Sequence, residues 1–396
     1  MGEEDSLIET SDNKEIRGKL ERILLGAREA GASDVHFKVG YKPIWRIAGK
    51  LTYVDTEVID SEKISEIAKL ILKEPKEKYF HEHKNVDSSL ELVRKGKKSE
   101  KDKIYRHRIN LGYASGQPFI AIRIIPDEII PIEKIGFPFE VWKNITGWKD
   151  PENKENIPGL KRGLVLITGI TGSGKTTTLA SLIQKINETR HEHIITLEDP
   201  VEYMYNPLKS IISQREIGVD LDSFGEGVKY SLRQDPDIIL VGEIRDRETA
   251  LHALEAAETG HIVFSTLHTK NAGETVRRYV NLFEAEDHDN IRNSLAANLA
   301  YVLSQQLIPY QKGVGRRLAM EVMNVKDSIA IKKHLREGDY HKIFSEIQLG
   351  QKYKMITMDD HIKQLYKEGK GEVSKEDAIS QAHDPEKMRE FIDKLA

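Results

Sequence analysis

One glycine-rich stretch near the middle of the chain carries the residue types that phosphate chemistry requires. Gly169, Gly174, Lys175 and Thr176 fit the P-loop pattern G-x-x-x-x-G-K-[ST], in which glycines let backbone N–H groups close around a polyphosphate. The lysine of such a loop reaches the β and γ phosphates, and its hydroxyl residue ligates Mg²⁺. The predicted nucleotide-binding residues are Gly169, Thr171, Gly172, Ser173, Gly174, Lys175, Thr176 and Thr177. An ordinary glycine turn is the alternative, but a chance match arises on the order of once per hundred chains of this length.

Three further side chains, Glu202, Glu243 and His268, are candidates for nucleotide hydrolysis. That reaction needs a metal ion at the β and γ oxygens, an oriented water, and positive charge where the transition state spreads its negative charge. Glu243 closes an apolar run and is expected near the Mg²⁺, so the predicted metal-binding residues are Thr176 and Glu243. Glu202 is expected to orient or deprotonate the water, because its strand is expected beside the strand of the P-loop. His268 is expected to contact the γ-phosphate. The alternatives are a surface salt bridge for Glu243 and a core or surface position for His268.

A parallel α/β sheet is needed to position these candidates. An apolar run precedes the P-loop, as a buried strand would, and apolar residues at helical spacing follow it. The expected strands are 164–168, 193–197, 238–241 and 262–266, alternating with helices that begin near 175, 223 and 246. Each candidate follows the end of one strand, at the edge where open α/β sheets bind ligands. From residue 290, where Ile291, Leu295, Leu299 and Val302 share a helical spacing, the chain is expected to be mostly helical.

Residues 1–128 predict a separate small α+β domain. Its expected elements are helices over 16–24 and 64–71 and strands near 35–39, 44–47, 104–111 and 119–125, with 112–118 as a loop. It contains Arg106, Arg108 and Arg123, for which surface salt bridging is the alternative to a functional role. The charged run 94–103 is expected to be a solvated hairpin loop, with a partner-binding patch as the alternative. Prolines and a polar stretch predict an interdomain linker over 129–160, followed by a second domain over 161–396.

The composition is that of a soluble protein with a heavily charged surface. Its 60 basic and 64 acidic residues give a net charge of −4, so no overall basic field attracts nucleic acid. The absence of cysteine excludes disulfides and cysteine-based zinc sites and fits a reducing compartment. No apolar run approaches the length that spans a bilayer, and the acidic start is unlike a signal peptide. We therefore expect a cytoplasmic protein that meets a membrane only through partners.

At these residues the sequence resembles the type II/type IV secretion ATPase superfamily, most closely its pilus retraction branch, the PilT-like motors of twitching motility. The resemblance rests on GASDVHF at 31–37, the P-loop, ITLEDPVEY at 195–203, LRQDPDIILVGEIRD at 232–246 and STLHT at 265–269. It implies a PAS-like N-terminal domain, a RecA-like P-loop ATPase domain with a helical C-terminal region over about 290–396, and ATP and Mg²⁺ as cofactors. It also implies a homohexamer with ATP sites between subunits, an inner-membrane pilus platform protein as partner, and a position at the inner face of the cytoplasmic membrane.

The resemblance assigns roles to five residues. Glu202 matches the family's catalytic glutamate, Glu243 its Walker B glutamate, and His268 its His-box histidine. Arg108 and Arg123 match paired N-terminal-domain arginines that approach the γ-phosphate when a site closes. Arginines of this kind contribute on the order of 10³–10⁵ in rate.

Branch features favour an ATP-driven retraction motor. Assembly ATPases of the superfamily carry a tetracysteine zinc element, and this chain has no cysteine. The A-I-R-N-L-I motif tied to retraction is replaced here by Ala330-Ile331-Lys332-Lys333-His334-Leu335, which keeps a pilus assembly or type II secretion motor as the alternative. A nucleotide-binding scaffold without turnover is a third hypothesis, which the presence of all the catalytic residue types disfavours.

Overall fold

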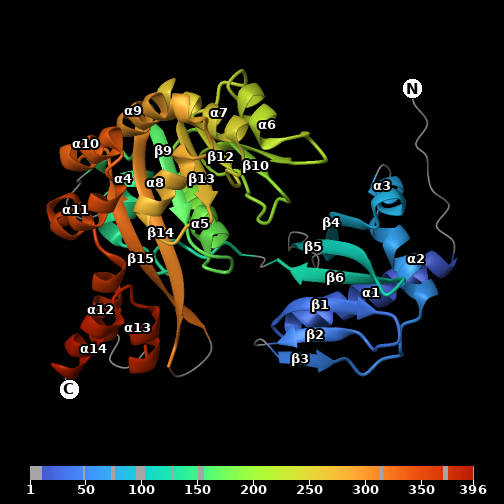
Figure 1. The fold of residues 1–396 in the computed structure, drawn as a ribbon. Helices are drawn as coiled ribbons and strands as arrows, with labels where there is room; N and C mark the ends of the chain where they lie inside the picture. The colour runs from blue at the N-terminus through green and yellow to red at the C-terminus, as the bar shows by residue number, and fades with distance from the viewer. Residues whose placement is uncertain are drawn as a thin grey trace. The chain divides into compact units, whose positions relative to one another are not determined.

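Two compact units, Met1–Glu128 and Ile129–Ala396, make up the chain, and each has its own hydrophobic core (Figure 1). The computed structural model describes residues 11–47, 50–72, 76–94, 103–125, 128–149, 156–311, 315–368 and 373–395.

The first unit is an antiparallel sheet with helices packed on one face. Its elements are α1 (Ser11–Glu29), β1 (Ala32–Lys38), β2 (Ile44–Ile47), β3 (Lys50–Tyr53), α2 (Ser61–Ile71), α3 (Lys76–His83), β4 (Asn85–Arg94), β5 (Lys103–Ala114) and β6 (Gln117–Ile124). The strand order is β3-β2-β1-β6-β5-β4. Alternation along β1 buries Val35 and Phe37 against α1 and α2 and leaves Asp34 and His36 on the other face.

Several elements of this unit differ from the sequence-based expectation. The stretch 112–118, expected to be a loop, is mostly paired, because β5 continues to Ala114 and β6 begins at Gln117. Only Ser115 and Gly116 form the turn, and both have positive φ. The strand β3 was not predicted, because it has only four residues and all of them, including Leu51 and Tyr53, are exposed. The charged run 94–103 lies outside the described residues, apart from the strand ends at 94 and 103.

The second unit contains the P-loop. Before the sheet come α4 (Phe139–Thr146), β7 (Trp148–Lys149) and β8 (Asn156–Ile157). The sheet region contains β9 (Gly163–Thr168), α5 (Lys175–Thr189), β10 (His193–Glu198), β11 (Ile211–Glu216), α6 (Phe224–Ser231), β12 (Ile238–Val241), α7 (Arg247–Glu258), β13 (Ile262–Leu267), α8 (Ala272–Val280), α9 (His288–Asn298), β14 (Leu299–Pro309) and β15 (Arg316–Asn324). The last part contains α10 (Ile329–Glu337), the 3₁₀ turn η2 (Tyr340–Lys342), α11 (Ile343–Leu349), α12 (Met358–Glu368), α13 (Lys375–Gln381) and α14 (Pro385–Asp393).

The predicted α/β fold is confirmed by a sheet in the order β11-β10-β12-β13-β9-β14-β15. All neighbouring pairs are parallel except β14 and β15. Helices α4 and α5 cover one face, and α6 to α11 cover the other. One expectation is wrong: β10, the strand before Glu202, is separated from β9 by β12 and β13. Sequence order does not decide strand order, because each crossover helix can return its strand to a more distant position in the sheet.

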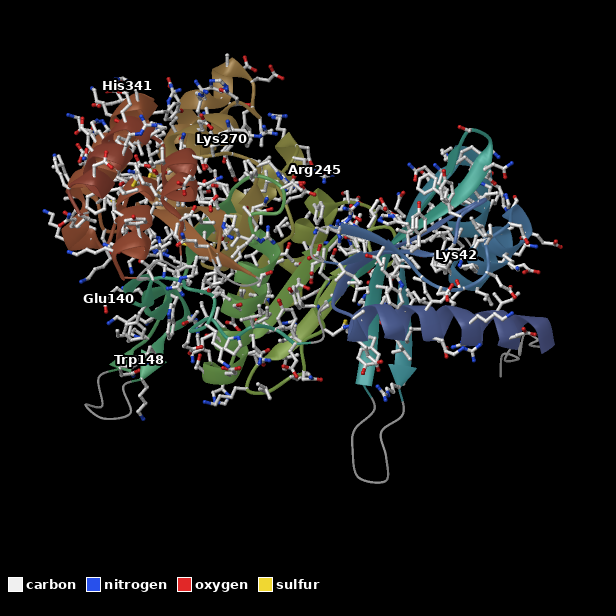
Figure 2. The ribbon with its side chains drawn as sticks, turned by 90° about the horizontal axis from the view of Figure 1, so that it is seen from below. Lys42, Glu140, Trp148, Arg245, Lys270 and His341 are labelled. Carbon is white, nitrogen blue, oxygen red and sulfur yellow. The ribbon has the colours of Figure 1, made fainter. Side chains whose placement is uncertain are left out.

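Residues 129–149, predicted to be part of an interdomain linker, are packed into the second unit. Residues 129–149 belong to the second unit, where Trp142 of α4 is 2% exposed and Ile145 is fully buried. They pack with Phe137 and Val141 against α5 and the adjacent sheet face. Figure 2 labels Glu140 and Trp148 in this region. Pro138, one of the prolines on which the prediction rested, directly precedes α4 and leaves the apolar face of the helix intact.

A long hairpin corrects the expectation of a mostly helical chain after residue 290. Helix α9 ends at Asn298, and Leu299 and Val302, expected on its apolar face, lie in β14. A short apolar run fits a buried strand as well as a helix, and here pairing with β9 and β15 decides in favour of the strand. The expected helical region is present from α10 onward, and α12 to α14 pack around Ile308 and Ala319 of the hairpin (Figure 1).

Candidate functional site

The site candidates follow parallel strands that end at one edge of the sheet. Strand β9 ends at Thr168, β12 at Val241 and β13 at Leu267, and their residues are in register. The P-loop, Glu243 and His268 therefore leave the sheet side by side. Strand β10 ends at the same edge, next to β12, and leads to Glu202.

The P-loop is held against β14 by glycine conformation and by one side chain. Gly169 has φ of +147°, and a Cβ there would overlap the carbonyl oxygen of Gln305. The Gln305 side chain donates to the carbonyl of Ser173 at 2.7 Å. Gly174 has φ of +88° and begins α5 with its backbone N–H groups directed into the loop. The loop thus has the shape of an anion cradle at the N-terminus of a 15-residue helix.

The donor groups of this loop fit a polyphosphate. The Lys175 ammonium donates to the carbonyls of Gly169 at 2.9 Å and Ile170 at 3.2 Å, so it lies over the mouth of the loop. Partial burial lowers the pKa of Lys175. The hydroxyl of Ser173 is buried and has no hydrogen-bond partner among the described residues. Thr176 lies exposed in the first turn of α5, where its hydroxyl is available to a Mg²⁺ ion.

Glu243 and His268 lie together beside Lys175. The His268 Nε2 is 3.5 Å from the Glu243 carboxylate, which is 15% exposed. Burial and the positive charge of Lys175 lower the pKa of His268, and the charge of Glu243 partly opposes that shift. The Glu243 charge also acts on Lys175. Predicted from three separate motifs, these side chains therefore form one electrostatically coupled cluster.

Arg245 is a member of this cluster that the sequence analysis did not single out. Its guanidinium forms an ion pair with the Glu243 carboxylate and is largely exposed (Figure 2). The signal available in the sequence was its place two residues after Glu243, in the loop that leaves β12. Arg245 thus places a positive charge beside the carboxylate that is predicted to bind Mg²⁺.

Glu202 lies in a loop that a second glutamate holds in place. One Glu198 oxygen accepts from Thr196 at 2.7 Å and Gln214 at 3.3 Å, and the other accepts from the Glu202 backbone N–H at 3.4 Å. Gln214 also donates to the carbonyl of Tyr203 at 2.7 Å. Burial raises the pKa of Glu198 to about 7, and the charge of Glu202 adds to the shift. Sequence reasoning missed Glu198, although the segment EDPVE contains both glutamates.

Two polar connections join these loops to the P-loop. The Tyr203 hydroxyl lies 3.4 Å from the Thr177 hydroxyl, which links the Glu202 loop to α5. On the other side, Thr269 beside His268 is 2.7 Å from Thr275 of α8, whose hydroxyl donates to Thr168 at 3.4 Å. Glu202 is thus brought toward the P-loop by its loop, although two strands lie between β10 and β9.

Arg108 and Arg123 lie in the first unit as direct cross-strand neighbours. They face one another in the register of β5 and β6, on the sheet face that α1 and α2 leave open. Arg123 donates to Asp34 at 3.1 Å, so the salt bridge weighed as its alternative is present. The side chain of Arg123 is 60% exposed.

Within the described residues, none of the helices is long and apolar enough to cross a bilayer.

Comparisons with known proteins place the chain in a family. A family model described as type II/IV secretion system protein matches residues 146–396. The chain is 36% identical to the type IV pilus retraction ATPase PilT of Pseudomonas aeruginosa, over 92% of this chain and 98% of that protein. It is 36% identical to a twitching motility protein of Neisseria gonorrhoeae, over 83% of this chain and 81% of that protein. A crystal structure of the pilus retraction motor PilT with bound ADP superposes with a TM-score of 0.78, covering 92% of this chain and 97% of that one. The chain therefore belongs to the type II/IV secretion system protein family.

Proposed function

We propose that this protein is an ATP-hydrolysing motor that drives type IV pilus retraction. The observation that carries the proposal is the nearly end-to-end match to a pilus retraction ATPase, in sequence and in fold. The ADP bound to the structural relative supports the P-loop as the nucleotide site. The match covers 98% of the length of that relative.

The proposed chemistry divides among the residues of the sheet edge. Backbone N–H groups of 169–177 and the Lys175 ammonium bind the phosphates, and Thr176 and Glu243 would hold a Mg²⁺ ion, which would supply positive charge to the phosphates. To bind the phosphates, the Lys175 ammonium leaves the two loop carbonyls to which it now donates. His268 then contacts the γ-phosphate from the neighbouring strand.

Glu202 is the proposed group that orients and deprotonates the attacking water. A general base of this kind contributes about 10²–10⁴-fold to the rate. Glu198 acts as a positioning residue, because its carboxylate accepts from the Glu202 N–H and fixes the backbone from which the Glu202 side chain extends.

We further propose that the motor is a homohexamer whose ATP sites lie between subunits. When an ATP site closes, Arg108 and Arg123 of the first unit complete it. Because the two arginines are cross-strand neighbours, both can act on one phosphate. Work is delivered to an inner-membrane pilus platform protein, with the motor on the cytoplasmic side of that membrane.

Steady-state ATPase activity tests the enzyme and its assembly together. Purified full-length protein is measured over a concentration series beside Glu202→Ala, Arg108→Ala and a control, Arg94→Ala, which removes an exposed arginine from the same unit. We expect specific activity to rise with assembly, at least about 10²-fold loss in both test variants, and little change in the control. If the dilute monomer is fully active and Arg108→Ala does not lower the activity, the idea of an ATP site shared between subunits is refuted. ATP binding without turnover would favour the scaffold hypothesis.

The direction of work is tested in cells. The changed segment 330–335 keeps assembly as the second candidate. A deletion strain that accumulates surface pili and no longer retracts them supports retraction, whereas loss of surface pili supports assembly.

A further inference from the structure

A cavity of about 400 Å³ lies in the second unit beside α8, apart from the residues assigned to nucleotide chemistry. Its buried lining residues are Glu321 of β15 and Ile343 and Ile347 of α11, and Asn271 and Glu274 at the start of α8 line it as half-buried residues. Its mouth is formed by exposed or half-exposed residues: Arg277, Tyr340, His341, Phe344 and His383. Figure 2 labels His341 on the helical segment at this surface.

Glu321 is the unusual group in this cavity. It is 3% exposed, and one of its oxygens accepts from the Ala272 backbone N–H at 2.8 Å. Within the described parts of the chain, no cation forms an ion pair with it. Burial, with smaller contributions from the charges of Asp359 and Glu274, raises the pKa of Glu321 to about 7. A buried carboxylate without a cation is costly, so this group holds its proton up to neutral pH, and a cation bound beside it would stabilise its ionised form.

The remaining lining defines what kind of cation fits. The carboxylates of Glu321 and Glu274, both in the lining, suit the three donors of an ammonium group. Ile343 and Ile347 are fully or almost fully buried and offer an apolar wall for a methylene stem. The Phe344 ring, stacked on His383 with centroids 5.4 Å apart, provides an aromatic surface near the mouth. The two cations of the lining, Arg277 and His341, are exposed, and neither contributes to the pKa shift of Glu321.

We propose that this cavity is a binding site for an alkylammonium group, with Glu321 as its anionic partner. The ammonium sits between Glu321 and Glu274, and its alkyl stem passes Ile343 and Ile347 toward the surface. Two sources have this chemistry: a free aliphatic amine and a lysine side chain from a second copy of this chain.

The site has a direct structural route to the P-loop strand. Glu321 lies opposite Ser304 in the register of β14 and β15, and Ser304 accepts from Thr168 at 2.9 Å. Glu321 also fixes Ala272, the first residue of α8, four residues after His268. An ammonium group that keeps Glu321 ionised strengthens the bond to Ala272, because charge-assisted hydrogen bonds are stronger than neutral ones.

Calorimetric titration of the full chain with butylammonium and with spermidine tests the first source, with 1-butanol as the neutral control ligand. We expect one amine site per chain and at least about tenfold weaker binding in Glu321→Gln, which loses the charge but keeps an oxygen for the Ala272 N–H. The matched control is Glu376→Gln, the same change at an exposed position of α13 outside the cavity. Binding at pH 6 should release protons and binding at pH 8 should release almost none, since the carboxyl pKa is about 7.

Carbodiimide cross-linking of concentrated protein tests the second source, with peptides identified by mass spectrometry. A cross-link between Glu321 and a lysine of another copy that disappears in Glu321→Gln supports the proposal. It also identifies a neighbouring chain as the occupant of the cavity. If Glu321→Gln does not fold, Glu274→Gln replaces it, with an expected loss of about threefold. Amine affinity equal in wild type and variant, together with no cross-link at Glu321, overturns the proposal. Neither measurement involves hydrolysis, so the outcome is independent of the proposed function.

Discussion

Two glycines of the P-loop should respond very differently to the same substitution. Both Gly169 and Gly172 have positive φ, +147° and +80°, so alanine at either position pays a backbone cost of about 1–2 kcal/mol. At Gly172 a Cβ meets nothing within 4 Å. At Gly169 it would overlap the Gln305 carbonyl oxygen and lie 2.5 Å from the Ser173 hydroxyl. The overlapped atom is backbone of β14, so rotating a side chain cannot relieve it.

The difference between the two variants therefore isolates the steric contribution. Overpacking of this kind costs about 1–3 kcal/mol beyond the shared backbone cost. For a unit of this size that corresponds to a difference of about 2–10 °C in the unfolding midpoint. Differential scanning calorimetry of the nucleotide-free protein measures it, and titration with a fluorescent ADP analogue shows whether the displaced loop also loses affinity. If Gly169→Ala unfolds no earlier than Gly172→Ala, the loop does not pack on β14 as described.

Two further predictions concern the second unit. The pKa of Glu198 is raised by burial from 4.5 to about 7, so its contribution to stability is fully present below pH 4.5 and is lost as the pH rises through 7. Urea unfolding should show Glu198→Gln gaining up to about 3 kcal/mol in stability relative to wild type between pH 5 and pH 8. Its ATPase activity should fall, because the amide keeps one acceptor oxygen where Glu198 uses two, for Thr196 and Gln214 on one side and the Glu202 N–H on the other. Parallel pH curves for the two proteins would contradict this. Trp142→Ala should lower the free energy of unfolding of the second unit by about 3–5 kcal/mol. Lys149→Ala, an exposed control in the same stretch, should change that free energy by less than about 0.5 kcal/mol. Equal unfolding midpoints for the two variants would mean that residues 129–149 are a linker after all.

Local patterns were sufficient for the parts of the fold whose residues interact with sequence neighbours or with a uniformly apolar core. The strand, loop and helix around the P-loop follow from glycine conformations and from helical spacing. Strands β10, β12 and β13 follow from buried apolar runs, and α7 from its Asp246 cap, whose side chain accepts from the Thr249 N–H at 2.8 Å. Since parallel strands end at one edge of a sheet, the convergence of Glu243 and His268 could also be predicted.

Tertiary structure decided what depends on partners distant in sequence. The run at 299–303 became a strand because β9 was available to pair with it. The apolar face of α4 turned an expected linker into core because α5 lay opposite. Chain order could not show that two strands lie between β10 and β9. The contact between Glu198 and Glu202 depends on how one loop folds back.

By itself, the sequence determined that this protein has a P-loop α/β domain, a smaller α+β unit before it, and a set of acidic and basic residues suited to nucleotide hydrolysis. These properties are local: they depend on residue types, on spacing along one strand or helix, and on glycines at positions where the backbone conformation disfavours other residues. The tertiary structure decided the strand order, the edge hairpin, the raised pKa values of Glu198 and Glu321, and the cavity beside α8. Each of these depends on burial between segments far apart in the chain, which no local pattern encodes.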